Sequence, residues 1–348
     1  MIGSIGTFRR FPVIAVLRLG YKASAEQFAP RQLLEFAVSA EQHGMDTCFV
    51  SDHFQPWRHT GGHAPFSFAW LAALGERTRK LVMGTSVVTP TFRYHPSVVA
   101  QALGTLGCLY PGRVVLGIGT GESLNEVPST GLAWPRFEER EARLREAVLL
   151  MRRLWTEERV THEGGYYRTV RATIYDRPEK PVPIYISAAG PKAAFAAGEL
   201  GEGFICTSGK SSSLYADRLL PNVKLGRAAA KSPAKDFDFM IEVKLSFDLD
   251  RRAALEATRY WAALSLSPEE KLGVEDPMEM ERLADALPLE RIATRWIVTN
   301  DPEEVVAHVR PYVELGFRHL VFHAPGPAQE RFLAQFEEYV APKLRAAF

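Results

Sequence analysis

The sequence has few cysteines and no long apolar run. Its 348 residues include three cysteines, Cys48, Cys108 and Cys206, which lie far apart and form no CxxC pair. A sparse, odd number is typical of a reducing compartment, where cysteines serve as small buried hydrophobic residues. No apolar run approaches the ~20 residues of a membrane span. The sequence therefore predicts neither a disulfide framework nor a membrane helix.

An excess of one charge is also missing. The chain has 42 Lys and Arg against 41 Asp and Glu, a formal net charge of +1. Because nucleic acids and anionic membranes select a basic excess, we expect neither as a partner. The length suits one α/β barrel as well as two domains. We expect a single domain over 1–348, with a short N-terminal extension at 1–12.

The N-terminal segment matches an export signal only in part. Arg9 and Arg10 precede an apolar stretch, as in twin-arginine signals. That stretch covers only Phe11 to Leu17 before Arg18 ends it, and no small-residue cleavage site follows. We therefore interpret it as an extension that leads into a first strand, and we expect a cytoplasmic protein.

Short β-branched or apolar runs alternate with amphipathic helical patterns along the chain. This alternation is typical of a parallel sheet built from βα units. Eight units predict a (β/α)8 TIM barrel, in which reactive residues follow the strands. The predicted strands are 13–20, 47–51, 80–88, 113–119, 182–188, 203–208, 239–247 and 318–324.

Two stretches interrupt the alternation. Residues 156–182 contain VTHEGGYYRTV, which predicts a hairpin that turns at Gly164-Gly165. Residues 265–290 predict short helical pieces separated by prolines. Insertions of this length at a barrel mouth usually shape the substrate site.

Candidate proton-transfer residues follow the second predicted strand. Asp52 is next to His53, and an acid near an imidazole can set its tautomer and prepare it for proton transfer. The place after a barrel strand favours function over a solvated loop. His59 and His63 follow, but a glycine pair between them keeps them off one helical face. We therefore expect no metal site.

A glycine-rich turn follows the fourth predicted strand. Its GxGxG spacing over 117–121 differs from GxGxxG, which argues against a Rossmann site. Two interpretations of Glu122 stay open, an acid that faces a ligand and a helix cap. Glu242 and Lys244 share one face of the seventh strand and predict an ion pair inside the barrel.

Three basic residues, Lys210, Lys271 and Arg295, are scattered in sequence, and surface solvation is the default for each. Lys210 is the strongest candidate among them, because barrel enzymes often hold phosphate after their late strands.

Longer motifs resemble the F420-dependent glucose-6-phosphate dehydrogenases of the luciferase-like barrel superfamily. The resemblance covers nearly the whole chain after about residue 17. Two departures, the short loop VPSTGLA and SAAGP in place of a glycine pair, lie on the cofactor side. The matching blocks are LGYKASAEQFAPR (19–31), VSDHFQPWRHTGGHAPFSF (50–68), MGTSVVTPTFRY (83–94), GTGESLNE (119–126), GFICTSGK (203–210), DPMEME (276–281), RWIV (295–298) and HLVFHAPG (319–326).

This resemblance implies an oxidoreductase of carbohydrate metabolism with the deazaflavin coenzyme F420. Its C5 would take a hydride from C1 of glucose 6-phosphate, or of a related hexose 6-phosphate, to give 6-phosphogluconolactone. The family also implies a homodimer and a non-proline cis peptide at Ser86-Val87. The implied cofactor-binding residues are Asp52, Ser86, Val87, Thr89, Asn125, Ala189 and Gly190.

The same resemblance implies roles in proton transfer and sugar binding. His53 is the candidate base, Glu26 stays open as the alternative base, and Trp57 and Glu26 would bind and polarise the sugar. Glu122 would supply a proton to N1 of the reduced ring. The residues that match the family's phosphate pocket are Thr207, Lys210, Lys271 and Arg295.

Two other functions remain as alternatives. An FMN-dependent luciferase-like monooxygenase would bind FMN and consume oxygen, and it would leave the phosphate-pocket cations without a role. A non-catalytic flavin or deazaflavin carrier would bind its ligand without turnover.

Overall fold

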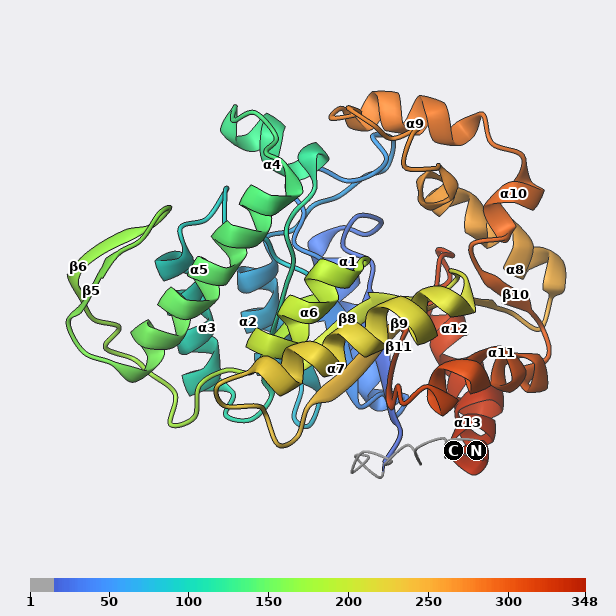
Figure 1. Cartoon of the computed structure of the whole chain (residues 1–348). Helices are drawn as coiled ribbons and strands as arrows, with labels where there is room; N and C mark the ends of the chain where they lie inside the picture. Colours follow the sequence, from blue (N-terminus) through green and yellow to red (C-terminus); the bar gives the residue numbers. More distant parts are fainter. Residues whose placement is uncertain (1–15) are drawn as a thin grey trace, which may run out of the picture.

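Parallel strands form a closed barrel in the computed structural model, which describes residues 16–348 (Figure 1). Neighbouring strands pair in parallel around the ring, and β9 closes it by pairing with both β8 and β11. This confirms the predicted eight-stranded barrel. In ring order the strands are β1 (Arg18–Ala23), β2 (Thr47–Val50), β3 (Val82–Thr85), β4 (Val114–Ile118), β7 (Ile184–Ser187), β8 (Gly203–Thr207), β9 (Asp238–Phe247) and β11 (His319–His323).

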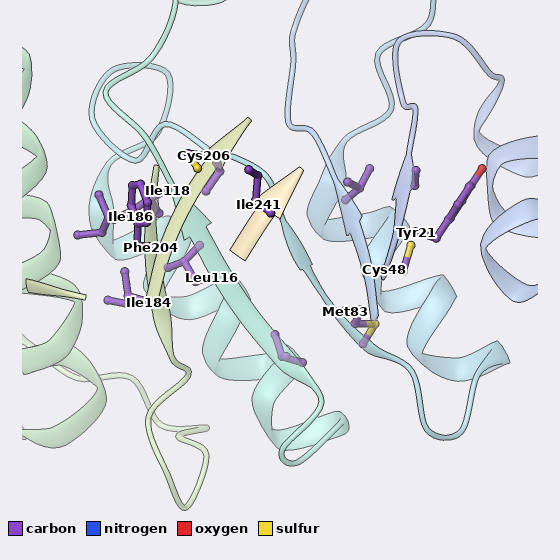
Figure 2. Packing of buried hydrophobic residues seen from close by; sticks show 14 of the residues in the cluster. Tyr21, Cys48, Met83, Leu116, Ile118, Ile184, Ile186, Phe204, Cys206 and Ile241 are labelled. Carbon is purple, nitrogen blue, oxygen red and sulfur yellow. The ribbon is translucent and has the colours of Figure 1, made fainter. Parts of the chain in front are cut away.

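Helices cover the outside of the barrel. They pack buried side chains against the outward face of the strands (Figure 2), where Leu116, Ile184 and Phe204 belong to one large cluster. Within residues 16–348, no helix is both long and apolar enough to cross a bilayer. The covering helices are α1 (Pro30–Gln42), α2 (Ser67–Arg77), α3 (Pro96–Leu109), α5 (Phe137–Thr156), α6 (Pro191–Leu200), η1 (Leu214–Leu219), α7 (Leu220–Ala229), α11 (Pro302–Glu314), α12 (Gln329–Gln335), η3 (Phe336–Val340) and α13 (Ala341–Ala347).

The first strand begins later than predicted. The sequence predicted it over 13–20, whereas β1 covers Arg18–Ala23. Pairing sets this position, because Arg18 is in register with His319 of β11 and Ala23 with Val50 of β2. Residues 13–15, the predicted extension at 1–12 and the arginine pair lie outside the described residues.

Cysteine burial was predicted correctly for two of three positions. Cys48 and Cys206 are buried free thiols, but Cys108 is exposed because it lies on the outer face of α3.

Alternate strand residues point into the barrel and form two layers. Phe49, Val115 and Met240 belong to an inner apolar cluster, separate from the one under the helices. Two positions further along β9, towards the carboxyl ends of the strands, lies Glu242, which forms an ion pair with Lys244. This confirms the predicted interior pair and adds a charged layer between the apolar cluster and the barrel mouth.

Both predicted insertions are present. The hairpin of β5 (Val160–Glu163) and β6 (Arg168–Ala172) turns where predicted and lies to one side of the barrel (Figure 1). Short helices of the second insertion build a small core with Leu124 and Trp57. The remaining elements lie after β4 or around the second insertion: α4 (Ser123–Thr130), α8 (Arg251–Ala257), η2 (Thr258–Ser265), α9 (Pro277–Asp285), α10 (Leu289–Ala293) and β10 (Ile297–Thr299).

Candidate active site

A cavity of about 610 Å³ lies at the carboxyl ends of β2, β3, β4 and β7. The loops after these strands supply its walls, as expected for a barrel of this kind. Ser86 itself does not line the cavity, but the cis peptide bond that joins it to Val87 is present. The predicted cofactor residues that line the cavity are Asp52, Val87, Thr89, Asn125, Ala189 and Gly190.

Glycines allow two loops to pack closely along one wall of this cavity. A Cβ atom on Gly119 would lie 2.9 Å from Val87 Cγ2, and one on Gly121 would lie 2.9 Å from Thr89 Cγ2. Gly121 also has φ +86°, a conformation that L side chains rarely adopt. The turn after β4 can therefore approach the loop after β3 only with glycine at these positions.

Asp52 holds the loops around the cavity in place. Its side chain is fully buried, and its Oδ1 accepts a hydrogen bond from Ser67 Oγ at 2.7 Å. Its Oδ2 accepts from Arg93 Nη2 at 2.6 Å and from Tyr94 OH at 2.8 Å. Because protein donors occupy both oxygens, the observed contacts of Asp52 position the wall of the cavity.

Asn125 connects α4 to the loop after β2. Its Oδ1 accepts hydrogen bonds from the backbone N–H of Phe54 at 2.8 Å and of Gln55 at 3.1 Å. Its side-chain nitrogen donates no hydrogen bond to the described part of the chain. That donor is therefore available to a ligand.

Sequence reasoning missed three charged residues of the cavity wall, Glu126, Arg140 and Lys192. Glu126 is buried, and this burial raises its pKa despite the charge of Arg93. Its spacing of four residues from Glu122 places both on one helical face, which was an available signal. The Arg140 guanidinium lies 4.6 Å from the centre of the Trp134 ring, and no sequence pattern indicated this stacking.

His53, which is partly exposed at the edge of the cavity, pairs with the buried carboxylate of Glu26. His53 Nδ1 lies 2.8 Å from Glu26 Oε1. Burial opposes the charge on both groups, but their mutual attraction outweighs it. The pKa of Glu26 is therefore lowered to about 2, and that of His53 is raised.

The sequence allows two interpretations of Glu122, a helix cap and an acid that faces a ligand. It occupies the N-cap position of α4, but its side chain makes no capping hydrogen bond. It lines the cavity together with His53. The geometry therefore agrees with the ligand-facing interpretation.

The scattered basic residues come together beside this cavity. Arg295 Nη2 donates to Thr207 Oγ1 at 3.2 Å, and Lys271 Nζ lies 4.8 Å from the centre of the Trp57 ring. Burial and the charge of Arg295 lower the pKa values of Lys210 and Lys271. Burial also lowers that of Arg295. Within residues 16–348, none of the three cations forms an ion pair with a carboxylate.

No metal cluster accompanies these residues. In the described part of the chain, no three His, Cys, Asp or Glu side chains are grouped so as to hold a metal ion.

Comparison with known proteins places this chain in a family. The family model described as "Luciferase-like monooxygenase" matches residues 10–319. An F420-dependent glucose-6-phosphate dehydrogenase of Nakamurella multipartita is 61% identical over 330 residues, which cover 95% of this chain and 97% of the relative. One of Intrasporangium calvum is 63% identical, over 95% of this chain and 99% of the relative. The chain belongs to the F420-dependent glucose-6-phosphate dehydrogenase family.

Solved structures related to this family agree in fold. An F420-dependent secondary alcohol dehydrogenase in complex with an F420-acetone adduct has a TM-score of 0.87 and 33% identity, over 94% of this chain and 99% of that one. The coenzyme F420-dependent tetrahydromethanopterin reductase of Methanopyrus kandleri has a TM-score of 0.78 at 20% identity, which supports the barrel alone.

Proposed function

We propose that this chain oxidises glucose 6-phosphate, or a related hexose 6-phosphate, at C1 with coenzyme F420 as the hydride acceptor. The observation that carries the proposal is the pair of His53 with the buried Glu26 carboxylate, which accompanies two candidate binding regions. One region is the glycine-walled cavity, and the other is the group of three cations without carboxylate partners. The names of relatives more than 60% identical to this chain support the same activity.

The cavity fits a flat cofactor. Gly119 and Gly121 let the turn after β4 pack closely against Val87 and Thr89, which a Cβ atom at either position would prevent. The ring would be held by Val87, Thr89, Asn125 and the backbone at 189–190. When bound, the deazaflavin supplies the carbon that accepts a hydride. Asn125 would orient it through the side-chain nitrogen that lacks a protein acceptor.

The state of the acid–base pair favours His53 as the base. Glu26, with a pKa of about 2, stays ionised near neutrality and is a weak proton acceptor. His53, with a raised pKa, accepts a proton more readily, and an oriented base on the sugar hydroxyl lowers the barrier to hydride loss. Glu26 would then position the imidazole.

The remaining residues fit the sugar phosphate. A phosphate monoester carries about −1.5 to −2 charge near neutrality. Lys210, Lys271 and Arg295 would neutralise that charge with help from the Thr207 hydroxyl, and Trp57 would contact the sugar beside Lys271. Glu122 would deliver a proton at the cofactor side of the cavity.

The finer properties follow from the family resemblance. The protein would act in the cytoplasm as a single-domain homodimer, without nucleic acid or a membrane as partner. Light scattering coupled to size-exclusion chromatography tests the dimer, and a monomeric mass at micromolar concentration would contradict it.

The activity is tested with purified protein, oxidised F420 and a panel of hexose 6-phosphates. We expect loss of the visible absorbance of the cofactor with glucose 6-phosphate and none with free glucose. Absence of reaction with every hexose 6-phosphate contradicts the proposal. Oxygen consumption with FMN and a reductant would instead support a monooxygenase.

The proton-donor role of Glu122 is tested separately. Glu122→Gln should lower kcat while cofactor affinity, followed by fluorescence titration, stays largely unchanged. Turnover at the wild-type level would remove Glu122 from proton transfer.

A further inference from the structure

We propose that Tyr215 is a positioning residue for the phosphate-binding part of the site, because its hydroxyl group joins the two ends of the loop that carries Thr207 and Lys210. This inference rests on the proposed function of those two residues and adds the group that holds them in place. The side chain of Tyr215 is buried, at 1% exposure. It would therefore act through the loop, without contact to the substrate.

The hydroxyl group of Tyr215 bridges the loop that follows β8. It donates a hydrogen bond to the backbone oxygen of Thr207 at 2.8 Å and accepts one from the backbone N–H of Lys210 at 3.1 Å. A phenol can donate one hydrogen bond and accept another at the same oxygen, so one side chain satisfies both ends of the loop. Thr207 and Lys210 are themselves exposed. Their positions therefore depend on what holds the backbone between them.

Packing fixes the ring of Tyr215. The residue lies on η1, and its side chain belongs to the large apolar cluster under the helices. The centre of its ring lies 5.3 Å from that of Tyr312 on α11, at an interplanar angle of 86°, and 6.4 Å from that of Phe317. Because packed side chains of this kind have little freedom to move, the ring gives the hydroxyl group a defined position. The hydrogen bonds then position the loop relative to the barrel.

Other acceptors take up the remaining amide groups of this loop. The N–H of Ser208 donates to the backbone oxygen of Glu242 at 2.9 Å, and that of Gly209 donates to Tyr312 OH at 3.2 Å. The amide groups of residues 208–210 therefore all have acceptors within the protein. A phosphate would meet the side chains of this loop, and the placement of those side chains decides how well it binds.

The loop also sets the position of Arg295. Its Nη1 donates to the backbone oxygen of Gly209 at 2.7 Å, and its Nη2 donates to Thr207 Oγ1 at 3.2 Å. Thr207, Lys210 and Arg295 are thus connected through one short stretch of backbone. If the ends of this stretch were released, a ligand would have to order these groups when it binds, which costs affinity.

The test removes the hydroxyl group and keeps the ring. In Tyr215→Phe we expect the dissociation constant for inorganic phosphate, measured by calorimetry on the cofactor-free protein, to rise roughly tenfold. That factor corresponds to about 1.4 kcal/mol, which lies within the range for two neutral hydrogen bonds. KM for glucose 6-phosphate should rise by a similar factor, while kcat and the dissociation constant for F420 stay near the parent values.

Tyr110→Phe is the matched control. The hydroxyl group of Tyr110 also donates to a backbone oxygen, that of Ala72 at 2.7 Å, but it lies between α3 and β4, at the amino-terminal end of the barrel. We expect the control to bind phosphate like the parent protein. An unchanged phosphate affinity in Tyr215→Phe, even with a lower melting temperature, would overturn the inference, and so would an equal loss in the control.

A second variant covers the case in which Tyr215→Phe does not fold. Tyr312→Phe removes only the acceptor of the Gly209 N–H, so it should weaken phosphate binding by a smaller factor. Parent affinity in that variant would show that hydroxyl contacts do not hold this loop for phosphate.

The two proposals fail separately. Weaker phosphate binding in Tyr215→Phe without turnover of any sugar phosphate by the parent protein contradicts the proposed function and leaves the positioning role intact. Turnover by the parent protein with an unchanged KM and phosphate affinity in Tyr215→Phe does the reverse.

Discussion

At the scale of single residues, the group of three cations has a distinctive property. Lys210, Lys271 and Arg295 repel one another in the absence of a ligand, and no carboxylate in the described chain pairs with them. Arg282, by contrast, is an exposed cation that pairs with Glu279. Unpaired charges of one sign that lie together, with Lys271 and Arg295 partly buried, indicate an anionic ligand.

Removal of one of these cations should weaken substrate binding. A hydrogen bond to a charged group contributes about 1.5–3 kcal/mol, so Lys271→Ala or Arg295→Ala should raise KM for glucose 6-phosphate roughly 10- to 150-fold. Steady-state kinetics checks this, with the exposed Arg282→Ala as control. An unchanged KM in both variants would exclude them from the substrate site.

The His53–Glu26 pair predicts a specific pH dependence. In Glu26→Gln the carboxylate that raises the pKa of His53 is lost, while burial and Lys22 still lower it. The acid limb of kcat/KM should therefore move to lower pH. The loss of imidazole orientation should also reduce kcat. The exposed Glu35→Gln is the control, and a limb that moves upward would contradict this assignment.

At the scale of elements, the close packing of β4 against β3 depends on glycine. A Cβ atom on Gly117 would lie 1.9 Å from the backbone oxygen of Thr85 on the neighbouring strand. Thr85 Oγ1 also donates a hydrogen bond to the carbonyl of Gly117 at 2.7 Å, which holds the two strands together. The strands therefore cannot move apart to accommodate a Cβ atom without breaking this bond.

Gly117→Ala should therefore destabilise the fold by at least the ~1–3 kcal/mol typical of overpacking, measured as a lower midpoint in urea. Gly165→Ala in the hairpin is the control, because its Cβ atom would meet Glu146 Oε2 at an ordinary 3.6 Å. Equal stability of the two variants would show that the barrel relaxes at this contact.

The elements that sequence predicts best are those with a strong local pattern. The eight strands are short apolar runs, and the hairpin has its glycine pair, so both were found. The start of β1 was misplaced because pairing of Arg18 with β11, rather than the apolar run before it, sets the strand. The gathering of Lys271 with Arg295 depends on how the second insertion folds back. No local pattern contains that information, and the family resemblance supplied it.

The same reasoning explains the residues that were missed. Lys22 lies outside the strand predicted over 13–20, and its buried contacts come from Ser86 after β3 and from Glu242 on β9. Glu126 and Arg140 depend on helix orientation in the same way.

At the scale of the whole molecule, a buried network joins three strands at the amino-terminal end of the barrel. Asp238 of β9 pairs with Arg18 of β1, and its Oδ2 lies 2.7 Å from Nδ1 of His319 on β11. Burial alone would raise the pKa of Asp238, but the charges of His319 and Arg18 lower it to about 2. This network links the side chains of β9, β1 and β11 where these strands begin.

The network predicts how stability depends on pH. The folded-state pKa of Asp238 is below its unfolded value of about 3.9. Its contribution is therefore present above about pH 4 and is lost as the pH falls towards 2. Asp238→Asn should unfold more easily at neutral pH, by about 3–5 kcal/mol for one partner of a buried pair, and should lose part of the acid dependence. Denaturant titrations at several pH values check this against the exposed Asp236→Asn, and equal acid profiles would contradict the assignment.

The cation group also has a mechanical consequence. Lys210 and Arg295 belong to segments next to β8 and β10, whereas Lys271 belongs to the second insertion, so a bound phosphate bridges the barrel and its insertion. The bound substrate then stabilises the contact between the barrel and the second insertion, which repulsion among the three cations otherwise weakens. Inorganic phosphate should do the same, which makes the choice of buffer a determinant of both the melting temperature and the apparent affinity for substrate.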